Sequence, residues 1–225
     1  MLNIHPILNK LHKQLIVSCQ PEAQESFYNT AFVCGMAQAA AIGGAGGLRL
    51  DSPESIQAVK AQLDLPVIGI WKQQYPGSDV YITPTLAAAE AILASGAEII
   101  AIDATSRPRP QESLAEMVSA LKGRVCLMAD VATFEEGLQA QKLGFDCVGT
   151  TLAGYTADRP ASQGPDFDLL DRLIKTLDLP IIMEGRIWTP AEAHQALEQG
   201  AHAVVVGSAI TRPQAIVRQF IGYTP

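Results

Sequence analysis

The feature that most constrains the fold is an eightfold alternation of short apolar runs with longer segments of helical pattern. Consecutive apolar runs are separated by far more residues than a hairpin needs, so neighbouring strands are expected to be parallel. Eight βα units predict one (β/α)8 TIM barrel rather than an open sheet. The predicted strands are 15–18, 47–50, 67–72, 98–103, 125–130, 146–150, 181–184 and 203–206. The predicted helices are 26–41, 53–63, 84–94, 112–121, 134–142, 167–177, 190–199 and 213–221.

The 225 residues are expected to form one domain over 1–225, with a short N-terminal helix covering the bottom of the barrel. The longest apolar runs fall well short of the ~20 residues that span a bilayer, so we expect no membrane partner. The four cysteines show no CxxC spacing and are interpreted as reduced thiols of a cytoplasmic protein.

The net charge of −7 and the lack of a basic block argue against nucleic acid as a partner. An anionic substrate would therefore need a local cluster of positive side chains. The charge pattern excludes a class of partner but does not identify a ligand.

The stretch from residue 181 to 213 predicts a phosphate site. Two apolar runs there end at glycines, Gly185 and Gly207, and Ser208 follows the second. Glycine turns that lead into helices present free backbone N–H groups and a helix dipole to an anion. In a barrel these would be the last two strands, where phosphate sites most often lie.

Polar residues end most of the predicted strands, where the chemistry of a TIM barrel is located. Because side chains alternate along a strand, Lys72 should face inward with Ile68 and Ile70, and Glu184 with Ile182. The ends of the strands carry Gln20, Arg49, Lys72, Asp103, Asp130, Thr150, Thr151, Glu184, Gly207 and Ser208.

Lys72 and Glu184 would lie on strands three and seven, opposite each other across the barrel mouth. Inverting a carbon centre needs a proton removed from one face and a proton delivered to the other, which opposed ionisable groups can do. Structural alternatives stay open: a lysine extending to solvent, a glutamate in an ion pair, Arg49 at the rim, and aspartates that orient loops.

A metal site is not predicted. The histidines at 5, 12, 194 and 202 lie away from the strand ends, and no HExxH or His-x-His spacing occurs. This pattern disfavours a metal-dependent sugar-phosphate 3-epimerase. The glycine run at 43–47 precedes a strand, so it is not a dinucleotide-binding fingerprint.

Taken together, the motifs resemble those of the N-acetylmannosamine-6-phosphate 2-epimerases of bacterial sialic acid catabolism. The resemblance covers nearly the whole chain, and its longest motifs are specific. They are LIVSCQ (15–20), GLR (47–49), LPVIGIWK (65–72), YPGSDVYITPT (75–85), IAIDAT (100–105), LMAD (127–130), GFDCVGTTLAGYT (144–156), EGRIWTP (184–190) and GAHAVVVGSAITRP (200–213).

The resemblance implies an isomerase that interconverts N-acetylmannosamine 6-phosphate and N-acetylglucosamine 6-phosphate at C2, without a metal or organic cofactor. It implies that Lys72 and Glu184 transfer protons and that the protein forms a homodimer. It also implies a set of substrate-binding residues: Gln20, Arg49 and Asp130 on the sugar, and Arg212 on the phosphate, beside the Gly185 and Gly207–Ser208 turns.

Two other functions stay open. One is a different phosphosugar isomerase or synthase barrel, such as those of tryptophan biosynthesis. The other is a catalytically inactive barrel that senses a phosphosugar. Which of Lys72 and Glu184 acts as base in each direction, and whether a substrate hydroxyl relays a proton, are not decided by the sequence.

Overall fold

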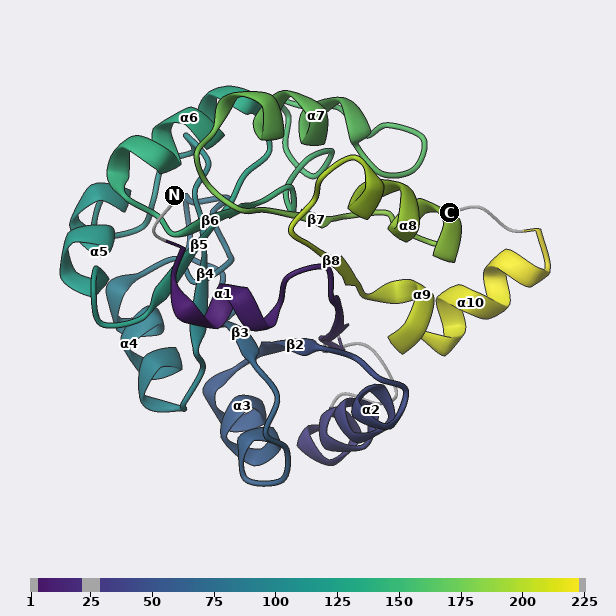
Figure 1. Cartoon of the computed structure of the whole chain (residues 1–225). Helices are drawn as coiled ribbons and strands as arrows, with labels where there is room; N and C mark the ends of the chain where they lie inside the picture. Colours follow the sequence, from purple (N-terminus) through teal and green to yellow (C-terminus); the bar gives the residue numbers. More distant parts are fainter. Residues whose placement is uncertain (1–3, 22–28, 223–225) are drawn as a thin grey trace.

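The computed structural model describes residues 4–21 and 29–222. Parallel strands close into a barrel in the order β1 to β8, with helices around the outside (Figure 1). This confirms the predicted (β/α)8 TIM barrel. The strands are β1 (Leu15–Cys19), β2 (Gly47–Asp51), β3 (Val67–Ile70), β4 (Ile99–Asp103), β5 (Cys126–Asp130), β6 (Cys147–Gly149), β7 (Ile181–Glu184) and β8 (Ala203–Val206).

Helices follow the strands close to the predicted positions. They are α1 (Pro6–Lys10), α2 (Thr30–Ile42), α3 (Pro53–Lys60), α4 (Leu86–Ala94), α5 (Leu114–Leu121), α6 (Phe134–Leu143), α7 (Phe167–Thr176), α8 (Pro190–Glu198), α9 (Ser208–Thr211) and α10 (Pro213–Phe220). Residues 26–28 of the predicted helix 26–41 lie outside the described ranges. In the structure, α2 starts at Thr30. The one-turn helix α9 was not predicted, because four residues give no periodic signal.

The strands are buried on both faces, as their apolar sequences require. One set of side chains, including Ile68, Ile70, Met128 and Ile182, fills the barrel interior. The alternate set packs against the surrounding helices. The predicted inward parity of Ile68, Ile70 and Ile182 is therefore confirmed.

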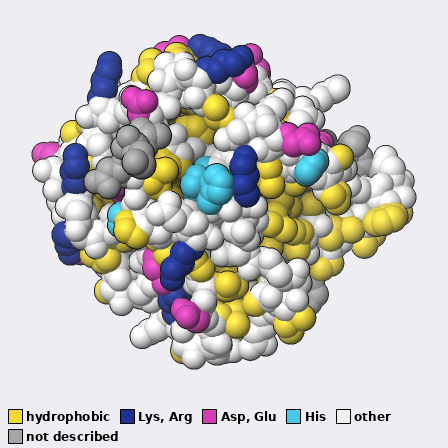
Figure 2. Space-filling view, viewed as in Figure 1, with side chains coloured by type: hydrophobic (Ala, Val, Ile, Leu, Met, Phe, Trp, Pro, Cys, Tyr) yellow, Lys and Arg dark blue, Asp and Glu magenta, His cyan; other side chains and the backbone are white. Residues whose placement is uncertain are grey.

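The short helix α1 closes the N-terminal end of the barrel, as predicted (Figure 1). Leu8 and Leu11 are fully buried and extend the interior cluster. The ring Nε2 of His202 lies 2.7 Å from the carbonyl oxygen of Leu8, and its Nδ1 lies 3.5 Å from Nδ1 of His12. Histidine side chains accordingly gather at the centre of this face (Figure 2). Polar contacts fasten α1 at the end of the barrel opposite the strand C-termini.

The third strand ends earlier than expected. β3 stops at Ile70, and Lys72 pairs instead with Ile82 in an antiparallel bridge. The backbone of Thr83 donates to Trp71, and that of Gln73 donates to Tyr81. The segment 71–83 therefore folds back as a hairpin over the mouth and carries Lys72 with it.

Candidate active site

A cavity of about 270 Å³ opens at the C-terminal ends of the strands. It is lined by eight of the nine residues to which the resemblance assigns a catalytic or substrate-binding role. The lining residues are Ser18, Gln20, Arg49, Lys72, Tyr81, Ile82, Thr151, Tyr155, Glu184, Gly185, Arg186, Ile187, Trp188, Val205, Gly207, Ser208, Thr211 and Arg212. Asp130, the exception, lies beneath the cavity and reaches it through Arg49.

Arg49 joins two carboxyl groups at the base of the cavity. Its Nη1 and Nη2 donate to Oδ1 and Oδ2 of Asp130 at 3.1 and 2.6 Å, and its Nη1 lies 2.9 Å from Oε2 of Glu184. Arg49 is 1% exposed and Asp130 fully buried, so Arg49 is not a rim residue. Burial alone would lower the pKa of Arg49, but Asp130 and Glu184 outweigh it and the pKa is raised.

Glu184 lies in an environment that suits proton transfer near neutral pH. Burial raises the pKa of Glu184 to about 7; Arg49 opposes this shift and the charge of Asp130 adds to it. A carboxyl group with such a pKa can give or accept a proton at physiological pH. The main chain of Glu184 is fixed by Thr150, whose hydroxyl accepts from its N–H and donates to its carbonyl.

Lys72 enters the cavity from the 71–83 hairpin. Its backbone N–H donates to Oδ1 of Asp51 at 2.9 Å, which fixes the main chain at the end of β2. Burial raises the pKa of Asp51, and the charge of Lys72 opposes that shift, as it does for Glu184. The charge of Lys72 therefore favours the ionised form of two carboxyl groups, those of Asp51 and Glu184.

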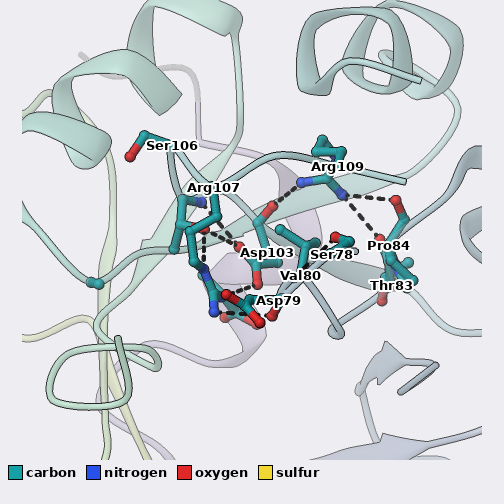
Figure 3. A network of polar contacts seen from close by, with 12 residues as sticks. Ser78, Asp79, Val80, Thr83, Pro84, Asp103, Ser106, Arg107 and Arg109 are labelled. Carbon is teal, nitrogen blue, oxygen red and sulfur yellow. Dashed lines mark hydrogen bonds and ion pairs between the residues drawn. The ribbon is translucent and has the colours of Figure 1, made fainter. Parts of the chain in front are cut away.

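A polar network holds the hairpin in place (Figure 3). Asp103, fully buried at the end of β4, accepts from Nη2 of Arg107 at 2.6 Å, and Arg107 donates onward to the carbonyl of Asp79. Arg109 donates to the carbonyls of Asp103, Thr83 and Pro84. Asp103 therefore orients a loop, as one of the sequence interpretations held, and does not line the cavity.

Tyr81 also belongs to the 71–83 hairpin and lines the cavity. Burial, followed by the charges of Asp103 and Asp130, raises the pKa of Tyr81 to about 12. Its phenol stays protonated at neutral pH and can donate a hydrogen bond to a ligand. The sequence reading did not single out Tyr81, since an aromatic residue in a loop carries no specific signal.

The predicted phosphate end lies where β7 and β8 finish. Gly185 has φ of +108°, a conformation that a residue with a side chain rarely adopts. At Gly207, a Cβ would lie 3.4 Å from the Cβ of Ser18. The two glycines bring the backbone to the cavity wall beside Ser208, and Nη2 of Arg212 lies 3.4 Å from the carbonyl oxygen of Gln20.

Of the described residues that line the cavity, four are basic and one is acidic. The basic residues are Arg49, Lys72, Arg186 and Arg212, and the acidic residue is Glu184. In a chain of net charge −7, this is the local positive cluster that an anionic ligand requires.

Arg186 is a site residue that the sequence analysis missed. Its Nη1 donates to the carbonyl of Ala153 at 2.7 Å and its Nε to that of Gly164 at 3.0 Å, while its backbone has φ of +54°. It ties the 153–164 loop to the turn after β7. Its place directly after Gly185 at a strand end was the available signal.

Over residues 4–21 and 29–222, no group of three or more His, Cys, Asp or Glu side chains is arranged to hold a metal ion. In the same part of the chain, no helix combines the length and apolarity needed to cross a membrane.

The closed barrel, with paired ionisable groups in one positively charged cavity, defines a (β/α)8-barrel enzyme suited to acid–base chemistry on an anionic substrate. Residues 33–224 match the model of the NanE family, described as "Putative N-acetylmannosamine-6-phosphate epimerase". The chain belongs to this family.

Relatives match over almost their full length. The chain is 47% identical to a "Putative N-acetylmannosamine-6-phosphate 2-epimerase" of Shouchella clausii, covering 97% of this chain and 98% of that protein. A solved structure of the N-acetylmannosamine-6-phosphate 2-epimerase from Clostridium perfringens superposes with a TM-score of 0.94 at 44% identity, covering 97% and 96% of the two chains. A thiamine phosphate pyrophosphorylase from Pyrococcus furiosus, at 17% identity and a TM-score of 0.63, shares the fold.

Proposed function

We propose that this protein is an N-acetylmannosamine-6-phosphate 2-epimerase, which interconverts that sugar and N-acetylglucosamine 6-phosphate in amino-sugar catabolism. The observation that carries the proposal is that Lys72 and Glu184 line the same cavity as Arg212, which lies at its basic, glycine-lined end. A phosphate bound at that end would set the distance from phosphorus to C2, and so place C2 between the two proton-transfer groups.

The reaction proceeds on the open-chain sugar. The base takes the C2 proton, the C2–H electron pair forms the C1–C2 double bond, and the C1 carbonyl oxygen becomes an enolate oxygen. Return of a proton to the opposite face of C2 re-forms the aldehyde with inverted configuration. Arg49, which is 1% exposed, or Lys72 stabilises the enolate charge.

Lys72 and Glu184 exchange the roles of acid and base in the two directions. Glu184, with a pKa of about 7, is available in both protonation states. Gln20, Arg49 and Asp130 bind or support the sugar, and Gly185, Gly207, Ser208 and Arg212 bind the phosphate. No metal or organic cofactor takes part in this scheme.

The proposal is tested by ¹H NMR of the protein with N-acetylmannosamine 6-phosphate, with and without EDTA. We expect N-acetylglucosamine 6-phosphate to form at the same rate in both samples. Loss of activity on chelation, restored by a divalent metal, would show a metal-dependent enzyme. Binding without turnover would instead support a phosphosugar sensor.

We also propose that the protein is a homodimer located in the cytoplasm. The four cysteines are free, as in a reducing compartment. Helix α10 projects from the barrel (Figure 1); none of its residues 213–220 is buried, and Val217 and Phe220 are 58% and 88% exposed. A second copy of the chain would cover this apolar face. Light scattering should give twice the mass of 24.0 kDa, and Phe220→Glu should reduce it toward one chain.

A further inference from the structure

The hydroxyl group of Thr151 lies between the two carboxyl groups of the site. Its Oγ1 is 2.7 Å from Oδ1 of Asp130 and 3.1 Å from Oε2 of Glu184. A hydroxyl has one hydrogen to donate. Thr151 can therefore donate a hydrogen bond to one carboxyl group only. The contact with the second carboxyl group is also a hydrogen bond only if that group is protonated and donates a hydrogen bond to Oγ1 of Thr151.

The geometry assigns that proton to Glu184. Asp130 accepts two hydrogen bonds from the guanidinium of Arg49, and such charge-assisted bonds favour the ionised carboxylate. The contact of Thr151 with Asp130 is also the shorter of the two. Asp130 is therefore the acceptor of the Thr151 hydrogen, and a lone pair of Oγ1 faces Glu184.

Neighbouring residues are arranged to keep this contact. Thr150 fixes the main chain of Glu184 through both its N–H and its carbonyl, while Thr151 contacts its side chain. At Gly149, a Cβ would clash with Cε of Met128 and would lie 3.0 Å from Oγ1 of Thr151 and 3.3 Å from Oδ1 of Asp130. The glycine therefore leaves space for Met128 and for the contact between Thr151 and Asp130.

We propose that Thr151 is a positioning residue that holds the transferable proton of Glu184, with its hydroxyl donating to Asp130 and accepting from protonated Glu184. The catalytic consequence rests on the proposed epimerase function. When Glu184 protonates C2, its O–H bond breaks as the C2–H bond forms, and the carboxylate left behind is paired with Nη1 of Arg49. The reverse step returns the proton to Oε2, where Thr151 again accepts it.

The test measures the protonation of Glu184 directly. The substrate-free protein is labelled with [δ-¹³C]glutamate and titrated by NMR, with Glu184→Gln to assign the signal, for wild type, Thr151→Val and Thr151→Ser. Loss of one accepting hydrogen bond should lower the pKa of Glu184 in Thr151→Val by about one unit. Thr151→Ser, which keeps the hydroxyl, should titrate like wild type.

Activity gives a second readout. In Thr151→Val we expect kcat to fall about tenfold and the Glu184 limb of the pH profile to move to lower pH, with both restored in Thr151→Ser. A Glu184 pKa that is unchanged or raised in Thr151→Val would overturn the proposal, since a raised pKa means that Thr151 donates to Glu184. Thr151→Ala replaces the valine variant if that variant does not fold. The titration needs no substrate, so a failure of the epimerase assignment would be seen separately.

Discussion

Nη1 of Arg49 lies 2.9 Å from Oε2 of Glu184 while the same guanidinium binds Asp130 through both of its Nη atoms. One buried cation thus serves two carboxyl groups of different roles. Asp130 holds Arg49 in place, and Arg49 opposes the rise in the pKa of Glu184 caused by burial. This arrangement keeps the pKa of Glu184 near neutral pH, so its carboxyl group is not fixed in one protonation state.

Removing the Asp130 charge should destabilise the protein strongly, because Arg49 would lose its bidentate partner inside the barrel. For Asp130→Asn we expect the free energy of unfolding in urea to fall by about 3 kcal/mol, as for other broken buried pairs. The control is Asp171→Asn, which removes the exposed ion pair with Lys175 on α7 and should cost about 0.5 kcal/mol or less. Equal losses in the two variants would contradict the buried role of Asp130.

Glu184 should make stability depend on pH. Its folded pKa of about 7 lies above its ordinary value of 4.5, so the folded protein binds more protons than the unfolded chain between these values. The contribution of Glu184 to the free energy of unfolding is fully present below about pH 4.5. It is lost as the pH rises toward 7, by about 1.4 kcal/mol per unit of difference between the folded and unfolded pKa values. Glu184→Gln should therefore gain stability relative to wild type as pH rises through this window. Urea unfolding at pH 5 and 8 measures this gain; an unchanged difference between the two proteins would count against the raised pKa.

The loop tied by Arg186 should loosen when the guanidinium is shortened. In Arg186→Lys, the contacts to Ala153 and Gly164 cannot both be kept, so backbone amides across 153–164 should exchange faster by mass spectrometry. We also expect a KM for the phosphosugar raised about tenfold, since Arg186 lines the cavity. Arg124→Lys, at a surface pair with Glu90, is the matched control. An exchange pattern identical to wild type would show that Arg186 does not hold the loop.

The contact that fastens α1 should weaken in acid. Burial lowers the pKa of His202, assisted by His12 and Lys13 and opposed by the Leu8 carbonyl. Stability from neutral His202 is present above its unfolded pKa of about 6.5 and is lost as the pH falls through its lower folded value. His202→Gln, which can still donate to Leu8 but does not titrate, should be less acid-sensitive between pH 7 and 5. Equal acid sensitivity in urea unfolding would exclude this origin.

Much of the fold and part of the site could be predicted because they depend on local patterns. The twofold alternation of side chains along the predicted strands 67–72 and 181–184 was enough to predict that Lys72 and Glu184 face one mouth. The same alternation could not show that β3 ends at Ile70. The hairpin that carries Lys72 is held by contacts from Asp103, at the end of β4, and from Arg107, both distant from it in the sequence.

Other parts of the site depend on distances that no sequence spacing encodes. Asp130 lies below the cavity and is connected to the ligand space through the side chains of Arg49 and Thr151, which line it. Thr151 contacts carboxyl groups from two other strands, β5 and β7. The positive φ of Arg186 arises from the turn after Gly185 and is not favoured by arginine itself.

The most direct test of the account is NMR of N-acetylmannosamine 6-phosphate with the protein in deuterated water, repeated with Lys72→Met and Glu184→Gln. We expect deuterium at C2 of the N-acetylglucosamine 6-phosphate formed, and a loss of turnover of about 100-fold or more in each variant. Product that retains protium at C2, or a variant with wild-type turnover, would contradict proton transfer between C2 and these two groups.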